Sequence, residues 1–318
     1  MCLENVKRDS HWQGQVPYEF EIPLKNLKER DYEMKKFYII ANGLKDTDLK
    51  VTNKIVNVLK RKFLSYKVNS DLNTAKNGNI SYTNKNDIDA DTDCIIVIGG
   101  DGTLIQAARD LADVDIPMIG VNLGHLGYLA EIEQDHIEDT ISMIIDNNYK
   151  IESRIMLNGS VYRNDTKIYE DIAFNDIVLG RAGNLRIIDF KVYVNDEYLN
   201  LYSADGIIIS TPTGSTAYNL SAGGPILEPS ANIMAITPIC SHTLGARSIV
   251  LSADSDIKIK ICSNRHIDDN DTKVYFDGNS SYMLKEGDVI KISKSNLVTK
   301  IMKLNRMSFV EVLHKKMN

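Results

Sequence analysis

The residues with the clearest chemical potential form a glycine-rich loop, Gly99-Gly-Asp-Gly-Thr103. The loop follows the apolar run Cys94–Ile98 and precedes a helix-compatible segment that begins at Leu104. Such a strand, loop and helix direct backbone N–H groups and a helix N-terminus at one point, where an anion binds well. Because Asp101 would repel a phosphate unless a metal ion or a proton transfer compensates, the loop indicates phosphoryl-transfer chemistry. A run of this kind is also common as a simple turn, and the loop alone does not separate the two interpretations.

A second polar loop lies between Asp205 and Pro225. The β-branched run Ile207–Ile209 leads into it, and hydroxyl-bearing residues and glycines follow. The hydroxyl groups offer hydrogen-bond donors, and the ring of Tyr218 could stack on a base. The same residues also fit a turn that caps a short helix from Thr216. In a chain that already carries a phosphate-type loop, this second loop favours nucleotide recognition.

The elements that must position the first loop alternate between strands and helices. Strand-like runs are found at Lys36–Ala41, Cys94–Ile98 and Met118–Val121. After the first of them, apolar residues recur at the spacing of one helix face, and a capping box that begins at Asp135 predicts a further helix. The alternation predicts an α/β, Rossmann-like N-terminal domain with a parallel sheet.

The elements around the second loop follow a different pattern. Ile188–Val194 and Ile257–Ile261 alternate apolar and polar residues, and the pairs Asn195-Asp196 and Asp277-Gly278 are typical of tight turns. This half of the chain therefore predicts a β-rich, antiparallel C-terminal domain.

These patterns divide the chain into four expected parts. They are a mobile extension (1–34), an α/β domain with the glycine loop (35–150), a β-rich domain (151–303) and a C-terminal segment (304–318). Because the two polar loops lie on either side of the expected boundary near Lys150, a cleft between the domains is the expected site.

The composition is that of a folded protein that works away from nucleic acid and membranes. Hydrophobic residues make up 43% of the 318 residues, and 37 basic against 43 acidic residues give a net charge of −6. A chain without a basic stripe is not expected to bind nucleic acid. The four cysteines lack metal-site spacing, and no apolar segment reaches the length of a membrane span. We expect no protein-held metal site, no membrane partner and a cytoplasmic location.

Five segments, taken in order, resemble the NAD kinase (ATP-NAD kinase) family. They are Gly99–Thr103, Asn122–Glu131, Phe174–Val178, Asp205–Pro225 and His242–Arg247. The first segment is also similar to loops of lipid kinases and phosphofructokinases, whereas the run Thr-Pro-Thr-Gly-Ser-Thr-Ala-Tyr inside the fourth is highly specific. The resemblance spans residues 35–314, and it implies that the last segment folds back onto the first domain.

The resemblance implies a reaction in which ATP, with a divalent metal such as magnesium, phosphorylates the 2′-hydroxyl of the adenosine ribose of NAD to give NADP. Asp101 is then the general base that takes the proton from that hydroxyl, since a ribose hydroxyl is a poor nucleophile. The ATP phosphates are expected on Gly99, Gly100, Gly102 and Thr103. Mg²⁺ is expected to be carried by these phosphates with several waters.

The resemblance also implies the residues that bind NAD. They are Asp101, Gly102, Tyr128, Asn175, Asp176, Arg186, Asp205, Thr216, Ala217, Tyr218 and Ser221. Asn175 and Asp176 are expected to hydrogen-bond the dinucleotide, and residues 216–218 to form a platform for adenine. Asp205 is expected to reach a dinucleotide in a neighbouring subunit, which implies a homotetramer or homodimer.

Plainer interpretations stay open at this point. Arg186 also fits a solvated strand residue, and Tyr128 fits a half-buried core residue after a glycine turn. A lipid kinase would share the glycine loop but would need an apolar acceptor pocket. A non-catalytic dinucleotide sensor would keep the pocket without turnover, which depends on geometry and closure.

Overall fold

The computed structural model describes residues 34–69, 83–124, 127–130, 132–183, 187–262, 272–304 and 307–317. The predicted mobile extension therefore lies outside the described residues, apart from Met34. The side chain of Met34 is buried, with 2% of its surface exposed. No helix in these described ranges is long and apolar enough to cross a membrane.

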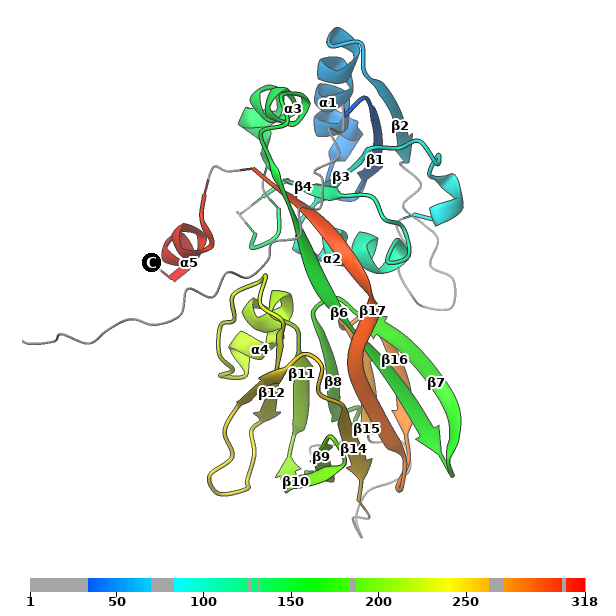
Figure 1. Ribbon diagram of the computed structural model, residues 1–318, viewed down its shortest axis with the longest axis vertical. Helices are drawn as coiled ribbons and strands as arrows, with labels where there is room; N and C mark the ends of the chain where they lie inside the picture. Colours follow the sequence, from blue (N-terminus) through cyan, green and yellow to red (C-terminus); the bar gives the residue numbers. More distant parts are fainter. Residues whose placement is uncertain are drawn as a thin grey trace, which may run out of the picture. The chain divides into compact units, whose positions relative to one another are not determined.

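The first half of the described chain forms a parallel sheet, as the sequence predicts (Figure 1). Its strands are β1 (Lys36–Ala41), β2 (Ser65–Asn69), β3 (Cys94–Gly99) and β4 (Met118–Asn122), in the spatial order β4-β3-β1-β2. Every residue of β3 and β4 is buried. Continuous β-branched and apolar runs suit strands that are covered on both faces, which is the usual setting of a parallel sheet.

Helices cover the two faces of this sheet. The helices α1 (Lys50–Arg61) and α3 (Ile137–Ile145) share one apolar cluster with Ile39 and Ile96. The helix α2 (Asp101–Asp110) packs on the other face, in a cluster with Tyr38. From β1 the chain moves to β2 on one side, and from β3 it moves to β4 on the other side. Because such crossovers are right-handed, the two connecting helices, α1 and α2, lie on opposite faces of the sheet.

The start of α3 differs from the prediction of a capping box at Asp135. A 3₁₀ turn, η3 (Gln134–His136), precedes the helix, and His136 occupies the N-cap without a side-chain hydrogen bond. Asp135 lies inside the 3₁₀ turn, one position before the N-cap residue of α3, so it does not occupy the N-cap position that the capping box requires.

The second half is antiparallel and contains two packed sheets. The six-stranded sheet has the order β13 (Ile249–Ser252), β12 (Ile233–Ile239), β11 (Gly206–Ser210), β8 (Asp176–Arg181), β15 (Thr272–Phe276) and β16 (Ser280–Leu284). An apolar cluster of β-strand side chains, including the fully buried Phe190 and Phe276, lies between this sheet and the other. The predicted antiparallel β-rich half is confirmed.

The other sheet continues from the antiparallel half into the parallel one. It runs through β10 (Glu197–Ala204), β9 (Ile188–Val194), β14 (Ile257–Ile261) and β17 (Val289–Lys303), and then to β4. The strand β17 also pairs with β6 (Lys150–Arg163), which pairs with β7 (Thr166–Ala173), while β5 (Ile132–Glu133) pairs with β4. Ile301 of β17 lies opposite Met118 of β4, so a single strand joins the two halves.

Short helical elements and tight turns complete the fold. They are η1 (Thr47–Leu49), η2 (Lys85–Asp87), η4 (Thr213–Thr216), α4 (Tyr218–Ser221) and α5 (Phe309–Met317). In the connection between β15 and β16, residues 277–279, Asp277 and Gly278 have φ of 51° and 66°, and this turn supports the site described next.

Candidate functional site

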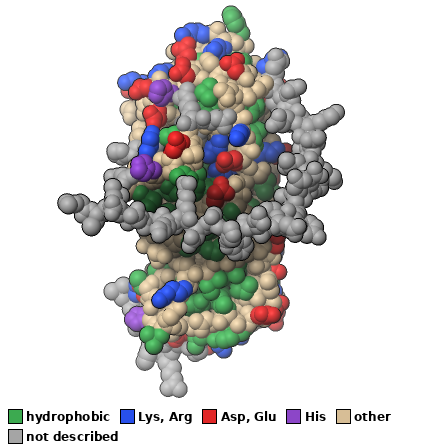
Figure 2. Space-filling model, turned by 60° about the vertical axis from the view of Figure 1, so that its left-hand side comes forward, with side chains coloured by type: hydrophobic (Ala, Val, Ile, Leu, Met, Phe, Trp, Pro, Cys, Tyr) green, Lys and Arg blue, Asp and Glu red, His purple; other side chains and the backbone are tan. Residues whose placement is uncertain are grey.

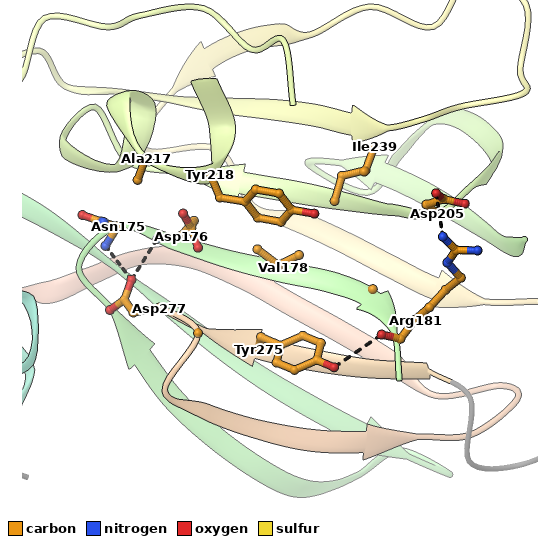
Figure 3. A pocket seen from close by; sticks show the side chains of 12 residues that line it. Asn175, Asp176, Val178, Arg181, Asp205, Ala217, Tyr218, Ile239, Tyr275 and Asp277 are labelled. Carbon is orange, nitrogen blue, oxygen red and sulfur yellow. Dashed lines mark hydrogen bonds and ion pairs between the residues drawn. The ribbon is translucent and has the colours of Figure 1, made fainter. Parts of the chain in front are cut away.

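A cavity of about 600 Å³ lies beside β8, in the antiparallel half. Figure 3 shows Tyr218 and Tyr275 on opposite sides of Val178. Side-chain amide and carboxyl groups lie at one end of the cavity, and the pair Arg181–Asp205 lies at the other. The cavity thus combines apolar surface and two aromatic rings with polar groups at both ends, a lining that suits a nucleotide-sized ligand.

Three separate segments supply this lining because β8 and β11 are neighbours. Asp176 lies opposite Ser210 in the antiparallel register, so the loop that follows β11 returns beside Asn175. The N–H of Thr211 donates to the carbonyl of Asn175 at 2.8 Å. A Cβ on Gly214 would lie 2.1 Å from the same carbonyl oxygen, so this position requires glycine.

Asp277 organises the polar end of the cavity. Its carboxylate accepts hydrogen bonds from the backbone N–H groups of Phe174 (2.7 Å), Asn175 (2.7 Å) and Asp176 (3.0 Å). Burial raises the pKa of Asp277, and the guanidinium of Arg109 opposes that rise. A buried carboxylate with three amide donors and a cationic neighbour holds the segment 174–176 in a fixed conformation.

Asp176 is the second buried acid at this end. Burial, and then the neighbouring charge of Asp277, raise its pKa to about 7. Near neutral pH the side chain of Asp176 therefore exists in both protonation states. It can either donate or accept a hydrogen bond at the cavity wall.

Arg109 links helix α2 to this cavity. Its guanidinium donates to the carbonyl of Phe276 (2.6 Å), to Asp171 (2.9 Å) and to the hydroxyl of Ser280 (2.8 Å), and Nε lies 3.8 Å from Asp277. One turn earlier in the helix, Gln106 accepts a hydrogen bond from Asn279 at 2.6 Å. The C-terminal half of α2 is therefore fixed to the turn that supports the cavity.

Asp101, at the opposite end of α2, is held by a different loop. Its carboxylate accepts the backbone N–H groups of Tyr128 (2.9 Å), Leu129 (3.3 Å) and Ala130 (3.4 Å). A Cβ on Gly127 would lie 2.0 Å from a carboxylate oxygen of Asp101, so the close approach of this loop depends on glycine.

The structure does not place Asp101 in the wall of the 600 Å³ cavity. All residues that line it, within the described part of the chain, come from the antiparallel half. Asp101 and Arg109 are eight residues apart on one helix, or about 12 Å at 1.5 Å per residue. Helix α2 is thus the connection between the glycine loop and the cavity.

Two family models match the chain on either side of its centre. The ATP-NAD kinase N-terminal domain matches residues 37–149, and the ATP-NAD kinase C-terminal domain matches residues 174–304. The chain belongs to the ATP-NAD kinase family. Among its relatives, the NAD kinase of Lachnospira eligens is 44% identical over 293 residues, which cover 89% of this chain and 100% of that protein. The NAD kinase of Agathobacter rectalis is 45% identical over 285 residues, covering 89% and 99%.

Solved structures of ATP-NAD kinase relatives share the fold. A yeast NADH kinase in complex with NADH has a TM-score of 0.79 at 23% identity, covering 90% of this chain and 88% of that one. An NAD kinase from Archaeoglobus fulgidus in complex with ATP has a TM-score of 0.69 at 22% identity, covering 88% and 98%.

The predicted NAD-binding residues of this ATP-NAD kinase fall into groups. Asn175, Asp176, Asp205, Ala217 and Tyr218 line the 600 Å³ cavity together. Thr216 and Ser221 do not line it, and Arg186 lies outside the described residues.

Tyr128 lines a different cavity of about 330 Å³, near β6 and α5. The ammonium of Lys316, on α5, lies 5.3 Å from the centre of the Tyr128 ring. A cation over an aromatic face at this distance is a favourable contact, so the ring has a partner within the protein.

The predicted phosphate-binding residues surround the start of α2. Gly102 is exposed and Gly100 partly so. Thr103 is only 2% exposed, and its hydroxyl accepts a hydrogen bond from Asn42 at 3.0 Å. A Cβ on Gly99 would lie 2.3 Å from that hydroxyl oxygen, so glycine lets Thr103 fold back under the loop.

Two hydroxyl groups of the second loop serve the protein itself. The hydroxyl of Thr211 donates to the carbonyl of Phe174 and accepts from the N–H of Gly214. The hydroxyl of Ser215 donates to the carbonyl of Pro212 and accepts from the N–H of Leu227. For these two residues the turn interpretation is the correct one.

Sequence reasoning missed the residues that organise the site. Asp277 was recognised only as a turn residue, and Arg109, Arg181 and Tyr275 gave no local signal. Arg181 donates to Asp205 at 2.8 Å, and its carbonyl accepts the hydroxyl of Tyr275 at 3.4 Å. Arg181 ends β8 and Asp205 directly precedes β11, so their contact can be recognised only once the pairing of these two strands is known.

Proposed function

We propose that this member of the family transfers the γ-phosphoryl group of ATP to the 2′-hydroxyl of the adenosine ribose of NAD, giving NADP and ADP. One observation carries the proposal: Asn175, Asp176 and Tyr218, which the family resemblance implies as NAD contacts, line one nucleotide-sized cavity. Relatives that are named NAD kinases and cover most of the chain support it.

The cavity wall contains a hydrogen-bond acceptor, on Asn175, that a ligand could satisfy. The side-chain oxygen Oδ1 of Asn175 is buried and has no hydrogen-bond partner among the described residues. A buried polar atom left unpaired is costly, and an amino or hydroxyl group of NAD would satisfy it. The ring of Tyr218, 47% exposed at the cavity wall, offers a face on which a base could stack.

In the proposed chemical step Asp101 acts as the general base. The 2′-oxygen of NAD forms a bond to the γ-phosphorus while its proton passes to the Asp101 carboxylate, and the bond from that phosphorus to the bridging oxygen of ADP breaks. A carboxylate has about four lone-pair positions. Three backbone N–H groups use three of them, which leaves one for the hydroxyl proton.

We propose that the donor enters as ATP with bound Mg²⁺. The described residues contain no group of three or more His, Cys, Asp or Glu side chains arranged to hold a metal ion. Mg²⁺ commonly keeps several waters and binds through substrate phosphates, so it fits here as part of the substrate. The N–H groups at Gly99, Gly100 and Gly102, with Thr103, are the proposed phosphate cradle.

We also propose a homo-oligomer, a tetramer or dimer, in the cytoplasm. Asp205 would reach the dinucleotide of a neighbouring subunit, exchanging its ion pair with Arg181. Figure 2 shows apolar side chains gathered over the lower part of the molecule, where Figure 1 places the six-stranded sheet. Leu244 and Val250 of this half are 99% and 45% exposed, and a second copy would cover such a surface.

We further propose that the chain is organised as 35–150, 151–303 and a C-terminal segment, 304–318, that returns to the first part. The Lys316–Tyr128 contact supports the return of the last segment.

The purified chain should form NADP when it is incubated with NAD, ATP and Mg²⁺, detected with an NADP-specific dehydrogenase. Omitting ATP, or replacing it with ADP, should abolish the signal. If the protein binds NAD in a calorimetric titration but no NADP is formed, the proposed reaction is wrong and the chain is a dinucleotide sensor.

A further inference from the structure

The turn that follows β1 lies against the glycine loop that follows β3. These two strands are adjacent and parallel, with Ala41 opposite Ile98, so their C-terminal ends meet at one edge of the sheet. The helices that follow them, α1 and α2, cover opposite faces. In open α/β sheets a crevice forms where the connections diverge in this way, and ligands bind in it.

Lys45 brings a positive charge to this edge of the sheet. Its ammonium nitrogen lies 3.2 Å from the position that a Cβ on Gly100 would take. Lys45 is exposed, and no carboxylate lies within ion-pair distance of it in the described ranges. The ammonium therefore lies over the loop that begins α2, without an acidic partner there.

Asp46, the acid next to Lys45 in the chain, is bound to backbone groups of α1 and not to Lys45. The carboxylate of Asp46 accepts the backbone N–H groups of Val51 and Thr52, both at 2.8 Å, and also the hydroxyl of Thr52. Asp46 thus serves the first turn of α1. The N–H groups of Lys45 and Asp46 both donate to the carbonyl of Asn42, which fixes the turn.

Asn42 ties the same turn to the glycine loop. Its side chain is 3% exposed, and its amide nitrogen donates to the hydroxyl of Thr103 at 3.0 Å. Its oxygen Oδ1 is buried without a hydrogen-bond partner among the described residues. Because the Thr103 oxygen accepts from Asn42, the hydroxyl proton of Thr103 remains available for another acceptor.

A cation at this edge would favour the binding of phosphate. The N-terminus of α2 attracts phosphate, but Asp101, its first residue, repels it. Lys45, over the same loop, compensates for that carboxylate, because an ammonium is a strong, flexible point charge for phosphate oxygens.

We propose that Lys45 binds the terminal phosphate groups of the nucleoside triphosphate donor where the Asn42–Lys45 turn meets the Gly99–Thr103 loop. Asn42 is a positioning residue that sets the orientation of Thr103. This inference rests on the proposed function, since it names where the donor of that reaction binds.

The test compares Lys45→Ala with Lys62→Ala. Lys62 is an exposed lysine at the far end of α1, so the control removes the same charge away from the crevice. At saturating NAD, we expect Lys45→Ala to raise the KM for ATP about 10- to 100-fold, the range for a lost hydrogen bond to a charged group. The Kd for NAD should stay unchanged, and Lys45→Arg should recover part of the loss.

Calorimetric binding of a non-hydrolysable ATP analogue separates this inference from the proposed function. Weaker binding to Lys45→Ala than to wild type and Lys62→Ala supports the donor site even if no NADP is formed. Equal KM and equal analogue affinity in all three proteins would overturn it. So would a Lys45→Ala variant that loses NAD affinity to the same extent, since the residue would then act on the whole fold.

Discussion

The cavity beside β8 and the loop edge around Asp101 are built in different ways. Strand pairing and buried charges form the cavity, with Asp277 holding three backbone N–H groups and Arg109 holding Asp277. At the loop edge, backbone N–H groups of residues 128–130 hold Asp101, and Lys45, which lies over the neighbouring Gly100, is exposed. The cavity is therefore preorganised for a ligand, whereas the loop edge keeps its charged groups accessible.

Helix α2 links the two regions that we propose to form one site. Its C-terminal half is locked to the turn below the cavity through Arg109 and Gln106. Its first residue is Asp101. A rigid helix sets the distance between a fixed cavity and an accessible acid, so changes at its two ends should have separable effects.

The largest expected effect is on turnover, and it comes from a substitution at the loop edge alone. Asp101→Asn should lower turnover about 10²- to 10⁴-fold, the usual contribution of a general base, because an amide cannot accept the hydroxyl proton. NAD binding, measured by calorimetry, should stay close to that of the wild type. A variant that makes NADP at the wild-type rate would contradict the proposed base.

The next largest effect is on stability, and it comes from removing Arg109, which ties helix α2 to the turn below the cavity. Arg109→Ala leaves the buried carboxylate of Asp277 without its cation, and we expect the free energy of unfolding in urea to fall by about 3–5 kcal/mol. Arg61→Ala is the matched control. Arg61 also pairs with an acid, Glu138, but both side chains are more than half exposed, so little change is expected. Similar losses in the two variants would show that Arg109 has no special role.

The pH dependence of stability sharpens the account of the cavity. The pKa of Asp176 is about 7 in the folded protein against a usual 3.8, so the folded state holds this proton more tightly than the unfolded state does. As the pH rises from 4 to 7, wild-type protein should therefore lose stability relative to Asp176→Asn, by on the order of 3 kcal/mol. The difference should still grow slightly through pH 7, where the folded-state group is half titrated, and become constant about one pH unit above it.

The titratable and charged groups near Asp176 include Asp277, from the turn after β15, Tyr218 and, through Asp277, Arg109 from α2. All three are present in the wild type and in Asp176→Asn, so the difference between the two proteins isolates Asp176. Denaturant unfolding at a series of pH values measures it. Parallel curves for the two proteins would be inconsistent with a raised pKa.

The smallest expected effect concerns the cavity wall. Tyr218→Ala should weaken NAD binding by about 1–3 kcal/mol, the range for a base stacked on an aromatic ring. Because the side chain is 47% exposed, little stability should be lost. Tyr218→Phe keeps the ring and should bind NAD like the wild type. An unchanged Kd for Tyr218→Ala would remove the ring from the proposed site.

Much of the fold could be predicted because strong local patterns decide it. The β-branched runs predicted β1, β3 and β4, and alternation predicted β9 and β14. The start of α3 was misplaced, since a 3₁₀ turn before the helix changes which residue occupies the N-cap. The polar strand β2 (Ser65–Asn69) carries no clear pattern and is recognised only by its pairing with β1.

In the candidate site, too, some features follow from local sequence and others only from the tertiary structure. The sequence by itself drew attention to the two loops and to Asp101 through short runs of particular residue types, and the family resemblance added the prediction for the pair Asn175-Asp176. Only the tertiary structure decided that Asp277 and Arg109 support Asn175 and Asp176, and that Lys45 lies over Gly100. Those contacts join residues from about 55 to almost 170 positions apart in the chain. Their partners are set by strand order and helix packing, which no local pattern of residue types encodes.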